Sequence, residues 1–296
     1  MIYIVIAVHN RLAATLECLH CITQQTYRDF KIILVDDGST DGTSQTIDQH
    51  YPGTTILHGD GQLWWTGAMA KGVQHVLERA TDTDYVLSLN NDVTFEPNYL
   101  AQLVQTSQSY HTAIVGSLCK DVIDRNQIHD AGITMHWYKY QYGQLAYNPV
   151  ITVATAVDTI SGRGVLIPVS VIKRIGNFAY RSLPHYGADY EFGFRAKAAG
   201  VPLVVDYGAV VYLKNDLTGF RPTAHVLSYR DEWRRLFSIK SPANVIVHLK
   251  IIWKHCPHFG LKLFDICYII AGNLFIASKN TLLYTLQLCS LRKSSS

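Results

Sequence analysis

The 296-residue sequence has little charge and almost no excess of one sign. Lysine and arginine total 26 against 23 aspartate and glutamate residues, which gives a formal net charge of +3. This excess is too small to indicate a nucleic-acid partner, and we expect none. With 17% charged and 48% hydrophobic residues, the chain is too apolar for intrinsic disorder. Its length allows one large α/β domain with an appendage.

The sequence also lacks the cysteine and histidine patterns of disulfide scaffolds and zinc sites. Its six cysteines are scattered, and the CxxC of Cys18 and Cys21 has no second pair. Both lie on a predicted apolar helix, so we expect them to pack in the core. The 13 histidines form no HExxH or H-x₃-H spacing. Ile2 to Val8 has no basic flank and is expected to be a strand rather than a signal peptide, which fits a reducing cytosol.

A glycine-rich phosphate loop is missing after the first predicted strand. A nucleotidyltransferase would need such a loop with a basic residue, and Val8 to Leu12 contains only Arg11 and no glycine. A dinucleotide-dependent oxidoreductase fits less well, because Gly59 and Gly61 follow a later strand and position 64 is tryptophan. The missing loop therefore disfavours both classes.

The first half of the chain does contain a regular alternation of strand and helix patterns. Apolar runs of strand length occupy Ile2 to Val8, Lys31 to Val35, Thr54 to Leu57, Tyr85 to Asn90 and Ala113 to Leu118. Helical patterns occupy Leu12 to Gln24, Thr43 to His50, Gly67 to Ala80 and Pro97 to Ser107. This series predicts an α/β fold with a mostly parallel central sheet flanked by helices.

Polar clusters follow three of these strands at their carboxyl ends, where ligands bind in such sheets. The clusters are His9, Asn10 and Arg11 after the first strand, Asp36 and Asp37 after the second, and Asn90, Asn91 and Asp92 after the fourth. A carboxylate of the second cluster can accept hydrogen bonds from a base or ribose, although a turn and helix cap explain it equally well. Asp92 can hold a hard divalent cation together with substrate phosphates, and its alternative is again a simple turn.

Further candidate residues lie in three other segments. Asp189 and Glu191 begin a predicted helix, where acidic residues also act as ordinary N-terminal caps. Arg163 lies between two glycines that allow close approach to a ligand, and a turn with a solvated arginine is the alternative. Trp64 and Trp65 fall in a predicted connection, where each either packs on the sheet edge or stacks on a ligand.

In their order along the chain, these segments resemble glycosyltransferase family 2. The matching motifs are Val8-His9-Asn10-Arg11, Val35-Asp36-Asp37-Gly38-Ser39-Thr40-Asp41, Leu89-Asn90-Asn91-Asp92 as a version of the D-x-D motif, and Gly187-Ala188-Asp189-Tyr190-Glu191-Phe192, followed by Arg195. Leu63-Trp64-Trp65-Thr66-Gly67-Ala68 further resembles a bacterial subgroup associated with cell-surface polysaccharide. Four ordered motifs are more specific than any single one, and the resemblance extends from Met1 to about Val211.

This resemblance implies a GT-A fold and an inverting transfer of a sugar from a nucleotide-diphosphate sugar to a hydroxyl acceptor. The acceptor is expected to be lipid-linked or a saccharide in the synthesis of O-antigen, capsule or exopolysaccharide, and the subgroup points toward rhamnose. A nucleotidyltransferase and a non-catalytic carbohydrate- or nucleotide-sugar-binding protein are the alternatives. No feature of the sequence indicates an oligomeric state.

The resemblance also implies roles for individual residues. Asp189 would be the general base and Asp92 the ligand of Mn²⁺ or Mg²⁺. Donor contacts are expected from His9, Asn10, Arg11, Asp36, Asp37, Trp65, Asn90 and Asn91, with Arg163 and Glu191 facing the acceptor or a phosphate. Two positions depart from the family pattern, because the first two D-x-D positions are asparagines and Ala70 stands where the family often has asparagine.

We expect a catalytic domain over residues 1–213 and a helical extension over 214–296. The extension mixes cationic and aromatic residues, which suits a helix at an anionic lipid surface. Its most apolar part, Leu263 to Ala277, contains Asp265 and is shorter than the roughly 20 residues of a spanning helix. The sequence therefore favours peripheral attachment to the inner face of the cytoplasmic membrane, and packing against protein is the alternative.

Overall fold

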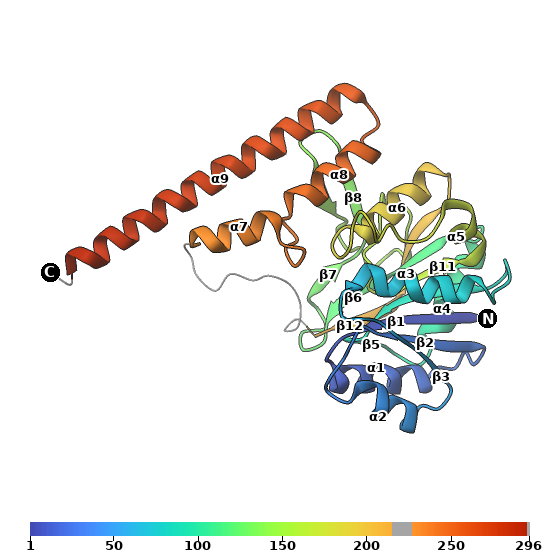
Figure 1. Ribbon diagram of the computed structural model, residues 1–296. Helices are drawn as coiled ribbons and strands as arrows, with labels where there is room; N and C mark the ends of the chain where they lie inside the picture. Colours follow the sequence, from blue (N-terminus) through green and yellow to red (C-terminus); the bar gives the residue numbers. More distant parts are fainter. Residues whose placement is uncertain (215–226, 295–296) are drawn as a thin grey trace. The chain divides into compact units, whose positions relative to one another are not determined.

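A computed structural model describes residues 1–214 and 227–294 of the chain, with side chains described as far as Leu286 (Figure 1). The chain divides into two compact units. The first comprises Met1–Met135 and Tyr142–Leu217, and the second comprises His136–Gln141 and Thr218–Ser296. The expected domain boundary at residue 214 adjoins residues 215–226, which lie outside the described part of the chain.

A large mixed sheet forms the centre of the first unit. Its strands are β1 (Ile2–Val8), β2 (Phe30–Asp36), β3 (Thr54–His58), β4 (Tyr85–Asn90), β5 (Val93–Thr94), β6 (Ile114–Asp121), β7 (Ile128–Asp130), β10 (Val153–Ala154), β11 (Val165–Pro168) and β12 (Leu203–Leu213). The main order is β10-β12-β6-β11-β4-β1-β2-β3, with β5 beside β12 and β7 beside β6. The pairs among β3, β2, β1 and β4 are parallel, as is β12 with β6, whereas β11 is antiparallel to both of its neighbours. A separate hairpin consists of β8 (Ile133–His136) and β9 (Gln141–Gln144).

Helices cover both faces of this sheet, as the mostly parallel arrangement requires. They are α1 (Leu12–Thr23), α2 (Thr43–His50), α3 (Trp64–Leu77), α4 (Tyr99–Ser109), α5 (Val169–Ile175) and α6 (Ala188–Ala198). One core cluster packs α1 and α4 on one face, and the other packs α3, α5 and α6 on the opposite face. The predicted mostly parallel sheet flanked by helices is confirmed.

Helix α1 shows how the apolar pattern of the sequence determines this packing. Its buried side chains are Thr15, Cys18, Leu19 and Ile22, which recur at the spacing of one helical face. Cys18 is fully buried and reduced, so the prediction that this cysteine packs in the core is confirmed. Helix α3 differs from the prediction, because it begins at Trp64, and both tryptophans therefore belong to its first turn rather than to a connection.

The second unit contains three helices among its described residues and the short segment His136–Gln141. The helices are α7 (Tyr229–Phe237), α8 (Val245–His255) and α9 (Phe259–Ser294). Ser228 and Asn244 accept backbone hydrogen bonds at the first turns of α7 and α8. In the short segment, the ring of Tyr138 stacks on Phe264 of α9 with centroids 5.1 Å apart.

The length of α9 corrects the sequence prediction. The segment expected to be too short to cross a membrane belongs to a continuous helix, and its stretch Phe259–Leu286 is long and apolar enough to do so. The prediction was wrong because Asp265, Asn273 and Asn280 interrupt the apolar run without interrupting the helix. Length and composition alone do not distinguish a span from a helix on a surface.

Candidate active site

The polar clusters after β1, β2 and β4 lie together at one edge of the sheet. Val8 pairs with Asp36 and Ala7 pairs with Asn90, so the three strands end at the same level. His9 Nδ1 lies 2.6 Å from the backbone oxygen of Asp37, within hydrogen-bond distance. The sheet edge therefore assembles residues that are far apart in the sequence.

The two aspartates after β2 fix the loops around them. Asp37 Oδ1 accepts the backbone N–H of Gly61 at 2.8 Å, and Oδ2 accepts that of Trp64 at 3.0 Å. Asp36 Oδ1 accepts the backbone N–H of Ser39 at 2.8 Å. Both side chains are buried, at 3% and 5% residue exposure. Because each carboxylate oxygen has a second lone pair, these bonds leave acceptor capacity for a ligand.

Asn10 joins the loop after β1 to the loop after β2 through hydrogen bonds. Its backbone lies in the left-handed region with φ of 51°, which asparagine tolerates better than most residues. The backbone N–H of Asn10 donates to Ser39 Oγ at 2.9 Å, and its Oδ1 accepts the N–H of Thr40 at 2.7 Å. The exposed loop after β1 is thus held against the loop after β2.

The three residues after β4 point in different directions. Asn90 Oδ1 accepts a hydrogen bond from Trp65 Nε1 at 3.0 Å, whereas Asn91 is buried and donates to Thr15 Oγ1 at 2.9 Å. Asp92 alone in this motif has a negative charge, and its Oδ2 lies 3.1 Å from Arg11 Nη1. Its side chain is 11% exposed.

A divalent metal can use only a limited set of protein ligands here. Among the described residues, no group of three or more histidine, cysteine, aspartate or glutamate side chains could hold an ion. Mg²⁺ in nucleotide sites is commonly held by one or two carboxylates together with substrate phosphates. The carboxylate of Asp92 fits that requirement as one ligand once its ion pair with Arg11 is broken.

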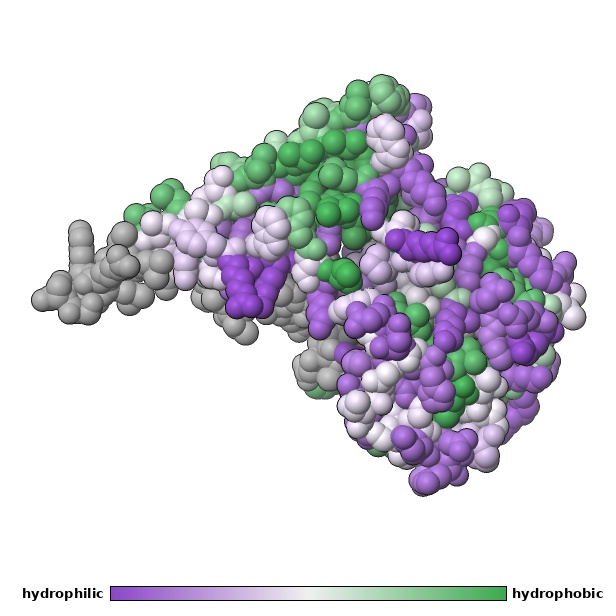
Figure 2. All heavy atoms as spheres, viewed as in Figure 1, coloured by the Kyte–Doolittle hydropathy of each residue, from purple (hydrophilic) through white to green (hydrophobic). Residues whose placement is uncertain are grey.

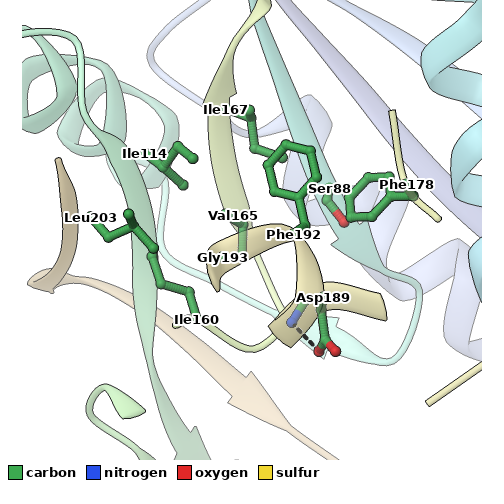
Figure 3. A pocket seen from close by; sticks show the side chains of 11 residues that line it. Ser88, Ile114, Ile160, Val165, Ile167, Phe178, Asp189, Phe192, Gly193 and Leu203 are labelled. Atoms are coloured by element: carbon green, nitrogen blue, oxygen red, sulfur yellow. Dashed lines mark hydrogen bonds between the residues drawn. The ribbon is translucent and has the colours of Figure 1, made fainter. Parts of the chain in front are cut away.

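Asp189 lies in the first turn of α6, where two backbone groups hold its carboxylate. Oδ2 accepts the N–H of Gly162 at 2.8 Å, and Oδ1 accepts the N–H of Tyr190 at 2.9 Å. Behind it lies a mainly apolar cavity of about 20 Å³, whose lining includes Phe178 and Phe192 (Figure 3). Burial raises the pKa of Asp189, while the two backbone bonds and the charge of Arg163 oppose that rise.

Trp65 connects Asp189 with the residues after β4. A Cβ built on Gly162 would lie 2.7 Å from Trp65 Cζ2 and 3.4 Å from Asp189 Cβ, so these groups are in close contact. Trp65 also bonds to Asn90 and packs edge-on against Phe178, with ring centroids 5.7 Å apart. The carboxylates of Asp37, Asp92 and Asp189 therefore lie at one edge of the sheet.

Two other predicted site residues have different surroundings. Glu191 is 2% exposed and forms two bonds to Arg195, at 3.1 and 3.0 Å. Arg195 also donates to the backbone oxygens of Ile175, Gly176 and Asn177. The pair holds the segment after α5, and Glu191 presents no exposed carboxylate to an acceptor. Arg163 is exposed beside Gly162, within electrostatic range of Asp189.

Sequence reasoning missed the backbone donors of this site. The N–H groups of Gly61 and Trp64 orient the carboxylate of Asp37, and that of Gly162 orients the carboxylate of Asp189. The only sequence signal for Gly162 was its place beside Arg163 in a glycine pair, because a backbone group leaves no residue-type pattern of its own.

Comparison with known proteins identifies the family of the chain. Residues 3–166, more than half of the chain, match the family described as Glycosyl transferase family 2. The chain belongs to glycosyltransferase family 2. It is an enzyme that transfers a sugar from a nucleotide sugar.

Curated relatives support this assignment at low identity. An N-acetylglucosaminyl-diphospho-decaprenol L-rhamnosyltransferase of Mycobacterium tuberculosis is 25% identical over 236 residues, covering 71% of this chain and 75% of the relative. Glycosyltransferase GlyG of Streptococcus pneumoniae is 26% identical over 118 residues, covering 39% of this chain and 38% of the relative.

Solved structures show the same fold. A structure of GalNAc-T7 with UDP, GalNAc and Mn²⁺ superposes with a TM-score of 0.60 at 15% identity, covering 90% of this chain but only 54% of that one. Residues 1–349 of Staphylococcus aureus TarS in complex with UDP give a TM-score of 0.55 at 14% identity, covering 91% of this chain and 70% of that one. The expected GT-A fold is thereby confirmed.

Proposed function

We propose that this family 2 enzyme inverts the configuration of the transferred sugar, with Asp189 as the general base. The observation that supports this most strongly is the position of Asp189 at the same sheet edge as Asp92 and Asp37, in contact with Gly162 and Trp65. Apolar surroundings that raise the pKa of Asp189 make the ionised carboxylate a better proton acceptor.

The proposed reaction is a single displacement. The acceptor hydroxyl gives its proton to the Asp189 carboxylate while the hydroxyl oxygen forms a bond to the anomeric carbon. The bond between that carbon and the diphosphate oxygen breaks, and the nucleoside diphosphate leaves with the bonding electrons. Gly162 and Tyr190 keep the carboxylate in place through their N–H groups.

The donor is proposed to bind over the loops that follow β1, β2 and β4. His9, Asn10, Asp36 and Asp37 would surround the nucleotide, and Arg11 would approach the diphosphate once it leaves Asp92. The remaining donor contacts of this proposal are Trp65, Asn90 and Asn91. Asp92 would hold Mn²⁺ or Mg²⁺, which as a Lewis acid offsets the charge of the diphosphate.

The acceptor is proposed to be a lipid-linked saccharide in cell-surface polysaccharide synthesis, at the inner face of the cytoplasmic membrane. The mycobacterial relative is named as an L-rhamnosyltransferase that acts on a diphospho-decaprenol-linked sugar. That name supports the proposed lipid-linked acceptor and is the basis for proposing L-rhamnose as the transferred sugar. Arg163 is exposed, its charge acts on Asp189, and it is the proposed contact for an acceptor hydroxyl or phosphate.

Substitution of Asp189 by asparagine tests the proposed chemistry. We expect turnover to fall by about 10²–10⁴-fold, because a positioned base typically contributes that much, while donor binding stays nearly unchanged. Turnover would be measured as nucleoside diphosphate release, and binding by calorimetry. The matched control is Asp82→Asn, since Asp82 is 70% exposed and precedes β4 at the opposite edge of the sheet. Near-normal turnover of Asp189→Asn would remove Asp189 from this role.

A further inference from the structure

The second unit exposes an unusually large apolar surface along α9 and α8. Only 6% of the most apolar 18-residue stretch within Phe259–Leu286 is buried. The most exposed large side chains of this surface are Trp253, Phe259, Leu274, Phe275, Leu282 and Leu286, at 57–72% exposure. Figure 2 shows apolar residues gathered along this helix. A helix of this length can either cross a bilayer or lie along its surface.

Contacts between α7 and α9 distinguish these two possibilities. The contacts are Arg235 Nη1 to Asn273 Oδ1 at 3.2 Å, Asn280 Nδ2 to Glu232 Oε2 at 3.0 Å, and the hydroxyls of Tyr229 and Thr285 at 2.7 Å. From residue 273 to 285, α9 rises by about 18 Å at 1.5 Å per residue. This distance is more than half of the roughly 30 Å hydrocarbon core of a bilayer. A spanning α9 would therefore bring α7 into the hydrocarbon.

Helix α7 has too many charges to enter hydrocarbon. Buried Glu232 and partly buried Arg235 neutralise each other as an ion pair at 2.7 Å. Arg230 and Arg234 are exposed, and Asp231 is partly exposed. Charged side chains at the bilayer centre are costly even when they can reach toward water. The packing of α7 on α9 is thus compatible with a helix in the plane of the lipid headgroups and incompatible with a span.

We propose that α7, α8 and α9 form a monotopic membrane anchor that binds anionic lipid, with α9 lying in the plane of the interface. Between residues 228 and 286, lysine and arginine outnumber aspartate and glutamate by eight to three. Two of the three acidic side chains, Glu232 and Asp265, are buried. The exposed charge is therefore mainly positive, which complements anionic headgroups.

Aromatic side chains of this unit support an interfacial position. Trp233 and Trp253 are 67% and 59% exposed, and tryptophan, with an apolar ring and a polar N–H, is enriched in membrane-interface belts. Lys262 Nζ lies 5.0 Å from the Trp253 ring centroid, so a cation and an indole occupy the same region. Tryptophan beside lysine is typical of the boundary between headgroups and acyl chains.

The orientation of α9 is tested with the full chain carrying a C-terminal epitope tag, in inside-out membrane vesicles. An in-plane helix leaves the tag on the same side as the catalytic unit, so added protease removes the tag without detergent. A spanning helix would place the tag inside the vesicle, protected until detergent is added, and that result would overturn the proposal.

Lipid binding is tested by flotation with vesicles of phosphatidylcholine alone or with phosphatidylglycerol. We expect binding that requires phosphatidylglycerol and weakens with salt. Phe275→Asp should lower vesicle partitioning by about tenfold or more, because it places a charge at the most exposed large apolar side chain described on α8 and α9. The matched control, Ile123→Asp, changes an equally apolar and 90% exposed residue of the first unit and should have no effect.

Turnover and oligomeric state distinguish lipid binding from misfolding and from dimerisation. Both variants should keep the nucleotide-sugar turnover of the unsubstituted enzyme with a water-soluble acceptor, which shows that they are folded. The proposal is wrong if the chain binds neither vesicle type and Phe275→Asp instead converts a dimer into a monomer. In that case a second copy of the chain covers the apolar surface of α8 and α9.

Discussion

The environment of Asp189 combines opposing influences on one carboxyl group. Burial against an apolar cavity raises its pKa, whereas the N–H groups of Gly162 and Tyr190 and the nearby charge of Arg163 lower it. The net effect is a raised pKa. A base that must be ionised to act then loses activity as the pH falls through this raised value.

Arg163→Gln should move that acid limb of the pH–rate profile to higher pH. The substitution removes a positive charge that favours ionised Asp189, so the pKa of the carboxyl group rises further. The measurement is kcat/KM against pH, because this ratio reports the ionisation of the free enzyme. Arg79→Gln is the control, since Arg79 is 51% exposed and follows α3. A lower rate at every pH with an unmoved limb would mean that Arg163 only binds substrate.

Arg11 provides a second prediction at this scale. Arg11 Nη1 lies 3.1 Å from Asp92 Oδ2 and so pairs with the carboxylate that would bind the proposed metal. Arg11→Gln should therefore tighten Mn²⁺ binding in the absence of nucleotide by roughly fivefold, which corresponds to about 1 kcal/mol for a partly exposed ion pair. Electron paramagnetic resonance of free Mn²⁺ would measure the binding. Asp92→Asn should abolish it, and equal Mn²⁺ affinity in Arg11→Gln and the parent would contradict the competition.

Candidate site residues could be named from the sequence where a side chain indicates the chemistry, but not where a backbone group acts. The motifs after β1, β2 and β4 and at the start of α6 gave Asp92 and Asp189 as candidates, and the roles of both stay predictions. Their surroundings depend on contacts that sequence spacing cannot reveal. Glu191 shares its motif with Asp189, yet it turns inward to Arg195.

At the scale of elements, the turn at Gly162 depends on the absence of a side chain. A methyl group there would lie 2.7 Å from Trp65 Cζ2, closer than atoms can approach. Gly162→Ala should cost about 1–3 kcal/mol of unfolding free energy through overpacking. Denaturant unfolding would measure this, with Gly53→Ala as control because nothing lies within 4 Å of its added methyl group. Equal stability of the two variants would show that Trp65 moves freely.

The strands and helices of the first half were predictable because their apolar periodicity is strong. β1 and β4 match their predicted bounds, whereas β6 continues for three residues beyond Leu118. Its last residues include Lys120 and Asp121, whose polarity hides a strand. The short strands β7 to β10 were not predicted, since two to four residues are too few to establish a period.

At the scale of the whole molecule, ligand binding should stabilise the folded enzyme. A nucleoside diphosphate with Mn²⁺ at about 100 times its dissociation constant adds roughly 2.7 kcal/mol. For a unit of this size we expect Tm to rise by roughly 5–10 °C. Differential scanning fluorimetry across several nucleotides would identify the donor base. In Asp92→Asn the shift should no longer depend on Mn²⁺, and a persistent Mn²⁺ effect would place the metal elsewhere.

The reversed strand β11 has a consequence for how such an enzyme can change. Because β11 is antiparallel to β4, with Val165 opposite Ser88, the segment that enters β11 arrives where β4 ends. Residues 161–164 and Asp189 thus join an edge otherwise built before residue 93. In the proposed mechanism, the earlier stretch of chain binds the leaving group and the later stretch activates the alcohol. Chimeras that exchange only the later stretch between relatives should therefore alter which alcohol is glycosylated while retaining the same nucleotide.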